Sequence, residues 1–167
     1  MYTNNKVRNV IYKVIEYFGD DVRRINHFLK VYGYVKMIGE CENLDDSMQE
    51  ILEVTAVLHD VGIKVAEQKY NSSAGHYQQL EGPPVAKKIL DELGYPDDFV
   101  ERVMYLIAHH HTYTNIDGMD YQILVEADFL VNADEDRLSS DAIENFKEKI
   151  FKTTTGIAVL ENNYLNL

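Results

Sequence analysis

The sequence predicts an all-α fold, a single compact bundle of about eight or nine helices over residues 1–167. Three observations support this prediction. Apolar residues recur at steps of three and four along most of the chain, which is the spacing of one helix face. No segment alternates apolar and polar residues between paired turn signals, as a strand hairpin would. No internal repeat, low-complexity tract or linker divides the chain, so one domain is expected.

The first three helices are expected over residues 7–18, 22–38 and 46–59. The first ends near Gly19, because glycine readily adopts the backbone conformation that terminates a helix. Aspartates at 20–21 and 45–46 can cap the second and third helices by accepting hydrogen bonds from free backbone N–H groups. Gly39 follows the last apolar position of the second helix and predicts its end.

Glycine and proline residues mark the helix starts and ends in the middle of the chain. Residues 64–75 are polar and rich in turn formers at their end, which indicates a short helix and a loop. Pro83-Pro84 fits the first turn of a helix over 85–93, since the N–H groups of that turn have no partner within the helix. Pro96 and two aspartates open the next helix, over 99–110, and a polar loop follows it.

Three more helices are expected, over residues 121–131, 142–151 and 157–165. The last two carry several apolar positions, among them Ile157 and Leu165. These residues could pack a partner subunit in a homodimer, or they could close the monomer's own core.

The composition of the chain limits its partners and location. The formal net charge is −12, whereas non-specific nucleic-acid binding needs clustered lysine and arginine, so no nucleic-acid polymer is expected as a partner. A small phosphorylated molecule can still bind through a local metal ion. No apolar run approaches the roughly 18 residues of a membrane span, and no secretory signal is evident. The single cysteine, Cys41, excludes an internal disulfide, which is typical of the reducing cytoplasm.

His59-Asp60 is the most informative feature for function. The pair follows the apolar run Ile51–Leu58 and precedes Val61-Gly62, whose glycine is a natural stop for a buried helix. Burying an imidazole and a carboxylate costs several kcal/mol unless each finds a partner. A divalent cation would satisfy both groups, since both are good metal ligands. Taken alone, the pair could also be a helix end at the surface.

Two more ionisable residues lie on apolar helical backgrounds. His27 occurs in Arg-Ile-Asn-His-Phe-Leu-Lys-Val, and Asp128 occurs in Ile-Leu-Val-Glu-Ala-Asp-Phe-Leu-Val. Asp128 falls on the face of the core residues, where a carboxylate is normally paired or bound to a metal. Glu126 points elsewhere on the same helix and could simply be solvated.

The ordered set His27, His59-Asp60 and Asp128 resembles the HD-domain superfamily of metal-dependent phosphohydrolases. The resemblance spans most of the chain and implies a single HD-type helical bundle. It implies that these four residues surround a divalent transition-metal ion such as Mn, Fe, Co, Ni or Zn. It also implies hydrolysis of a phosphate ester, often of a nucleotide.

Some members of that superfamily bind a second metal ion through residues between the His-Asp pair and the last Asp. The triplet His109-His110-His111 matches one such position. Consecutive helical residues point about 100° apart, so at most one or two can face a site. His110 is the first candidate and His109 the second, although the triplet could also lie free at a frayed helix end.

At the other position, relatives often carry a histidine shortly before a glycine. This chain has Gln78-Gln79-Leu80-Glu81-Gly82 there, which makes Glu81 the candidate. Glu81 could bind the second ion or act as a general acid or base beside the metal. It could also be an acidic group that stabilises a helix N-terminus.

Basic residues near the ligands are candidates for binding phosphate. Lys64 and Lys69 follow the His-Asp pair closely, and either could neutralise phosphoryl charge. Arg23 and Arg24 lie one helical turn before the first histidine, so one of them could reach the same site, although both could be solvated. Ser72-Ser73 could donate to phosphate only if their loop folds over the site.

These observations predict an enzyme, a phosphatase or phosphodiesterase that cleaves a nucleotide or another small phosphorylated metabolite with a metal-activated water. Asp60 would bridge the two ions if a second ion were bound. Two other functions fit the same residues. A di-iron site could activate dioxygen instead of water, or the domain could bind a nucleotide or a metal as a non-catalytic sensor.

Overall fold

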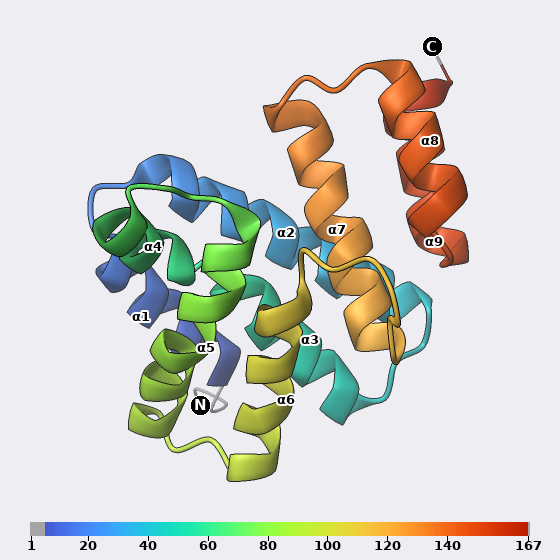
Figure 1. Cartoon of the computed structure of the whole chain (residues 1–167). Helices are drawn as coiled ribbons and strands as arrows, with labels where there is room; N and C mark the ends of the chain where they lie inside the picture. Colours follow the sequence, from blue (N-terminus) through green and yellow to red (C-terminus); the bar gives the residue numbers. More distant parts are fainter. Residues whose placement is uncertain (1–5, 167) are drawn as a thin grey trace.

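The computed structural model describes residues 6–166, and it confirms the all-α fold, with no strand among these residues. In chain order, the helices are α1 (Lys6–Phe18), α2 (Val22–Cys41), α3 (Asp46–Leu58), α4 (Gly62–Tyr70), α5 (Gly75–Glu92), α6 (Asp97–His109), α7 (Met119–Glu135), α8 (Ser140–Ile150), α9 (Thr154–Leu160) and the π-helical turn η1 (Glu161–Leu165). Figure 1 shows α8 and α9 beside the later turns of α7, apart from α1, α4 and α5. Within residues 6–166, no helix has the length and apolar character needed to cross a membrane.

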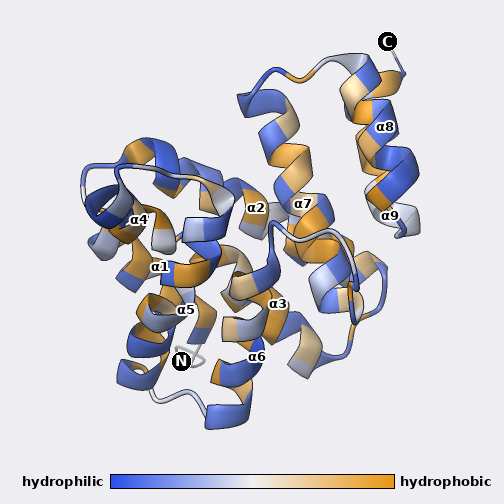
Figure 2. Cartoon of the chain, viewed as in Figure 1, coloured by the Kyte–Doolittle hydropathy of each residue, from blue (hydrophilic) through white to orange (hydrophobic). Residues whose placement is uncertain are grey.

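Helix α3 is the centre of the bundle. Residues 52–58 are all buried, as is expected of a helix that other elements surround on every side. It packs against α1, α2, α6 and α7. Two apolar clusters flank it, one built mainly with α1 and α5 and the other with α7 and the C-terminal helices. Figure 2 shows apolar residues gathered where α2, α3 and α7 meet and hydrophilic residues along the outer sides of α5 and α8.

The apolar residues of the last two helical segments close the core of this chain. Ile157, Val159, Tyr164 and Leu165 are partly buried and pack against the cluster that α7 lines. Of the two uses that the sequence allows for them, the structure shows packing within the monomer.

The interpretation that Glu126 could be solvated is wrong. Its side chain is fully buried, and its carboxylate accepts hydrogen bonds from Gln122 Nε2 at 2.7 Å, Lys152 N at 2.7 Å, and Thr153 N and Oγ1 at 3.0 and 2.5 Å. The donors at 152–153 belong to the segment that enters α9, so Glu126 joins α7 to the C-terminal helices. A helix-wheel prediction missed this because the face in question is covered by elements distant in sequence.

Several helix boundaries differ from the sequence prediction. Helix α5 begins at Gly75, so Pro83-Pro84 lie inside it and not in its first turn. Packing against both α4 and α6 supports the helix through the prolines, despite the two missing N–H donors. Helix α2 continues through Gly39, which packs closely against Gln49, and α7 runs four residues beyond Val131.

Gly62 does not terminate α3 but begins α4, and its role is steric. A Cβ atom on Gly62 would lie 2.6 Å from both the backbone O of Gln78 and the backbone N of Gly82. A Cβ atom on Gly82 would in turn lie 2.6 Å from a methyl group of Ile107. The two glycines therefore let α4, α5 and α6 approach one another closely beside the His59-Asp60 turn.

Candidate metal centre

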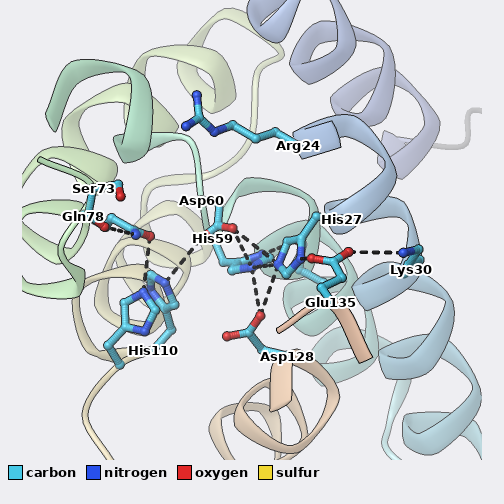
Figure 3. Close-up of polar contacts among 12 residues, drawn as sticks. Arg24, His27, Lys30, His59, Asp60, Ser73, Gln78, His110, Asp128 and Glu135 are labelled. Atoms are coloured by element: carbon cyan, nitrogen blue, oxygen red, sulfur yellow. Dashed lines mark hydrogen bonds and ion pairs between the residues drawn. The ribbon is translucent and has the colours of Figure 1, made fainter. Parts of the chain in front are cut away.

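Three helices bring the four predicted ligands together (Figure 3). His27 lies on the first half of α2, His59 is the C-terminal cap of α3, and Asp60 follows it in the turn before α4. Asp128 lies midway along α7. Each of these helices carries an apolar face into the core, so the polar groups meet at a buried junction.

The ligand atoms are close enough to surround one ion. His27 Nε2 lies 3.2 Å from His59 Nε2 and 3.2 Å from Asp128 Oδ1. Asp60 Oδ2 lies 3.3 Å from the first imidazole nitrogen and 3.4 Å from the second, and Asp128 Oδ1 lies 3.4 Å from His59 Nε2. Ligand bonds of about 2.0–2.2 Å place neighbouring donor atoms roughly 3.0–3.5 Å apart, so this spacing fits a divalent transition metal.

The hydrogen bonds of the two histidines point their lone pairs at each other. His59 Nδ1 donates to the carbonyl of Ala56 at 2.7 Å, and His27 Nδ1 donates to Glu135 Oε2 at 2.9 Å. A neutral ring that donates at Nδ1 carries a lone pair at Nε2. Two Nε2 lone pairs facing each other repel unless a cation lies between them. The residues present therefore fit a metal ion, and outer hydrogen bonds of this kind are typical of metal-bound histidines.

Electrostatics lead to the same conclusion. Burial lowers the pKa of His59, but Asp60 and Asp128 outweigh that effect and raise the pKa to about 9. Burial raises the pKa of both carboxyls, but the histidines hold the pKa of Asp60 and of Asp128 below the usual range. The cluster favours positive charge at its centre, whether that charge is a proton or a metal ion.

A cavity of about 500 Å³ opens onto this cluster. Helices α2 and α7, the Asp60 turn and the start of α5 line it. The lining residues are Asp21, Arg23, Arg24, His27, Asp60, Ile63, Ser73, Gln78, His111, Asp128, Asn132, Glu135 and Asp136.

Comparison with known proteins identifies the family. The family model described as HD domain matches residues 24–144, a span that includes all four predicted ligands. This chain belongs to the HD domain family. The fold is similar to the crystal structure of a predicted HD superfamily hydrolase from an uncultured Thermotogales bacterium, with 25% sequence identity and a TM-score of 0.67. That similarity covers 94% of this chain and 84% of the other. No curated protein matches the sequence.

The HD domain has a second group of potential ligands beside the first. His110 Nδ1 donates to the carbonyl of Ile107 at 2.7 Å, so its lone pair is at Nε2. That nitrogen is buried, finds no hydrogen-bond partner in the described part of the chain, and lies 3.5 Å from Asp60 Oδ1. Asp60, His110 and His111 offer donor atoms that all lie within 4.8 Å of one another. Asp60 belongs to both groups, with Oδ2 toward His27 and His59 and Oδ1 toward His110.

The histidine triplet divides between two faces of the HD domain. His110 lies at the site, whereas His109 Nδ1 donates to the carbonyl of Tyr105 and its ring lies against Tyr105, at a centroid distance of 4.2 Å. His111, which the sequence analysis did not single out, lines the cavity. Burial and the neighbouring His110 lower the pKa of His111 to about 4, so its ring is neutral.

Gln78, not Glu81, faces the site from α5. Gln78 Nε2 donates to the carbonyl of Ser73 at 2.6 Å, which turns Oε1 toward His111 Nε2 at 3.2 Å. Glu81 was the sequence candidate because of its charge, and the uncharged Gln78 carried no comparable chemical signal.

The structure does not bring Glu81 or the two lysines to the cavity. Glu81 accepts hydrogen bonds from Lys69 Nζ at 2.8 Å and from the Tyr70 hydroxyl at 2.7 Å, and these donors lower its pKa. Lys64 Nζ donates to the carbonyl of Tyr17 at 3.0 Å and lies over the ring of that tyrosine. The basic residues that do line the cavity are Arg23 and Arg24.

Proposed function

We propose that this HD domain is a metal-dependent phosphohydrolase that cleaves a phosphate ester of a small metabolite. The observation that carries the proposal is the pair of buried imidazole nitrogens of His27 and His59, 3.2 Å apart with their lone pairs facing. Two carboxylates flank them and a cavity opens onto them. A divalent ion held there would polarise a phosphoryl oxygen and lower the pKa of a water.

The chain's own residues prepare the site for that chemistry. Glu135 and the Ala56 carbonyl fix the orientation and tautomer of the two histidines before any ligand arrives. Asp60 turns Oδ2 toward these histidines and Oδ1 toward His110, so it connects the two halves of the site. Such preorganisation removes the cost of orienting these groups during the reaction.

The size of the cavity supports a small substrate. Typical small-molecule sites have volumes of about 300–1,000 Å³, and this cavity, at about 500 Å³, can accept a nucleotide or a compound of similar size. The net charge of −12 argues against a nucleic-acid polymer. The structural relative is a predicted HD superfamily hydrolase, which supports hydrolysis as the reaction class.

Elemental analysis of the purified protein, followed by a phosphate-release screen with Mn, Fe, Co, Ni and Zn, tests the proposal. We expect at least one ion per chain and turnover of phosphate esters. Asp60→Ala should abolish turnover while circular dichroism shows an intact fold, and Asp98→Ala, on the exposed side of α6, is the matched control. Dioxygen consumption without phosphate release would indicate the oxygenase, and tight ligand binding without turnover would indicate the sensor.

A further inference from the structure

The charges that line the cavity are unbalanced. Two arginines line it against five carboxylates, which are Asp21, Asp60, Asp128, Glu135 and Asp136. Lys30 and Glu67 pair with lining residues from outside and cancel each other. A divalent ion would offset two of the three excess negative charges. With a single divalent ion in place the cavity therefore stays acidic, and it repels a ligand that carries several negative charges.

Arg23 is the cation that remains for an anionic ligand. Arg24 is engaged by Asp21 at 2.9 Å and by Glu67 at 2.5 Å. The Arg23 side chain is exposed, lines the cavity and makes no ion pair or hydrogen bond with any residue within 6–166. It lies four residues before His27, so both side chains share one face of α2.

The rest of the lining offers uncharged polar groups. Ser73 and Gln78 lie at the start of α5, and Asn132 lies on α7 between Asp128 and Glu135. Amide and hydroxyl groups can donate to and accept from the hydroxyl groups of a ligand. Figure 3 shows Ser73 and Gln78 on the side of the site opposite His27.

We propose that this site selects small esters that carry one phosphoryl group and no other negative charge, with Arg23 binding the phosphoryl oxygens. The Ser73, Gln78 and Asn132 side chains bind hydroxyl groups of the same ligand. The inference rests on the proposed phosphohydrolase function and names its substrate class. It excludes polyphosphates and esters with a second acidic group, because these would face Asp136, whose carboxylate has no cation beside it within residues 6–166.

Calorimetric titration of the manganese-loaded protein with two inert phosphonates tests the inference. Phenylphosphonate and 4-carboxyphenylphosphonate differ by one remote carboxylate, and neither can be hydrolysed as an ester. We expect phenylphosphonate to bind at least about tenfold more tightly, a difference of about 1.4 kcal/mol. Asp136→Asn should narrow that ratio, because it removes one of the repelling charges.

Three variants test the role of Arg23 in the same titration. Arg23→Met should weaken phenylphosphonate binding about tenfold, and Arg23→Lys should restore most of it because the positive charge returns. Lys88→Met, in α5 outside this cavity, should bind like the wild type. Equal binding of the two phosphonates, no binding of either, or unchanged affinity in Arg23→Met would overturn the inference.

Separate turnover assays keep this inference distinct from the proposed function. Phenyl phosphate and 4-carboxyphenyl phosphate are the hydrolysable counterparts of the two probes. If the phosphonates bind selectively and no ester is hydrolysed, the selectivity holds and the hydrolase proposal fails. If esters are hydrolysed without preference, the hydrolase proposal holds and the selectivity fails.

Discussion

Helix α7 carries two buried carboxylates, and their surroundings are opposite in kind. Glu126 accepts four hydrogen bonds from donors that the chain itself supplies, three of them from residues 152–153. Asp128, two residues later, faces the Nε2 atoms of His27 and His59 at 3.2 and 3.4 Å. The exposed fractions are 0% and 5%, so the two side chains differ in their hydrogen-bonding partners and not in burial.

A structural carboxylate differs from a candidate metal ligand in what its neighbours offer. Around Glu126 every nearby group donates, so the folded chain is complete without a ligand. Around Asp128 the nearby groups are lone pairs, so a cation is needed to complete the cluster. Each experiment below perturbs either the metal cluster around Asp128 or the hydrogen bonds of Glu126, and leaves the other group unchanged.

The largest effect is expected from Asp128→Ala. Loss of this ligand should empty the metal site and lower phosphate release by at least about a thousandfold, because the hydrolysis proposed above depends on the ion. Metal content per chain and phosphate release measure the two effects, and circular dichroism checks the fold. Full metal content in this variant would contradict the assignment of Asp128 as a ligand.

Glu126→Gln should act on stability and not on the metal. The amide oxygen can take the place of Oε1 and the NH₂ can donate to the Thr153 hydroxyl, but the hydrogen bonds lose their charge assistance, so we expect a loss of about 1–2 kcal/mol in the free energy of unfolding. Urea unfolding measures it, with Glu148→Gln on the exposed face of α8 as the control. Metal content should stay at the wild-type value. A loss of metal with no change in the free energy of unfolding would contradict the assignment of Glu126 to the fold and not to the metal site.

Glu135→Ala tests a residue that holds a candidate metal ligand in place without binding the ion itself. Without Glu135, the Nδ1–H of His27 loses its acceptor, and metal affinity should fall about 10- to 100-fold. Glu135→Gln should retain more affinity, because its amide oxygen can still accept from Nδ1. Competition with a chelating dye measures both variants. Equal affinity in the alanine variant and the wild type would show that Ala56 and packing suffice to orient the ligands.

A change of pH gives the mildest test. In the metal-free protein the pKa of His59 is raised to about 9, above its unfolded value of about 6.5. Its stabilising contribution is therefore full below pH of about 6.5 and is lost as the pH rises through about 9. Metal binding needs the deprotonated imidazole, so metal affinity should rise over the same interval. Thermal melts of stripped and loaded protein should diverge with pH, and parallel curves would contradict this account.

Local sequence was sufficient for most of the helices, and together with the family resemblance it identified the four candidate ligands. The ligands could be predicted because each interrupts an apolar helical pattern, which marks His27, His59 and Asp128 as buried ionisable residues. The N-terminal cap at Asp45 was also predictable, and the structure confirms it with a hydrogen bond from Met48 N at 2.9 Å.

The remaining features depend on contacts between distant segments. Glu135 lies beyond the apolar pattern of α7, so nothing local shows that it accepts a hydrogen bond from His27. Gln78 is uncharged and gave no chemical signal, and its position became visible only once α5 was known to begin at Gly75. The burial of Glu126 likewise depends on donors 26 and 27 residues away.

The backbone contact between Gly62 and Gly82 has a consequence for how this domain can vary. Gly62 is two residues after Asp60, and the contact reaches Gln78 on the facing helix. One added methyl group at Gly62 would push α5 outward and carry Gln78 away from His111. Gly62, which has no side chain, thus sets the distance between the candidate metal ligands and the part of α5 that lines the cavity. Substitutions should be tolerated more readily along the first turns of α5 than at this crossing point.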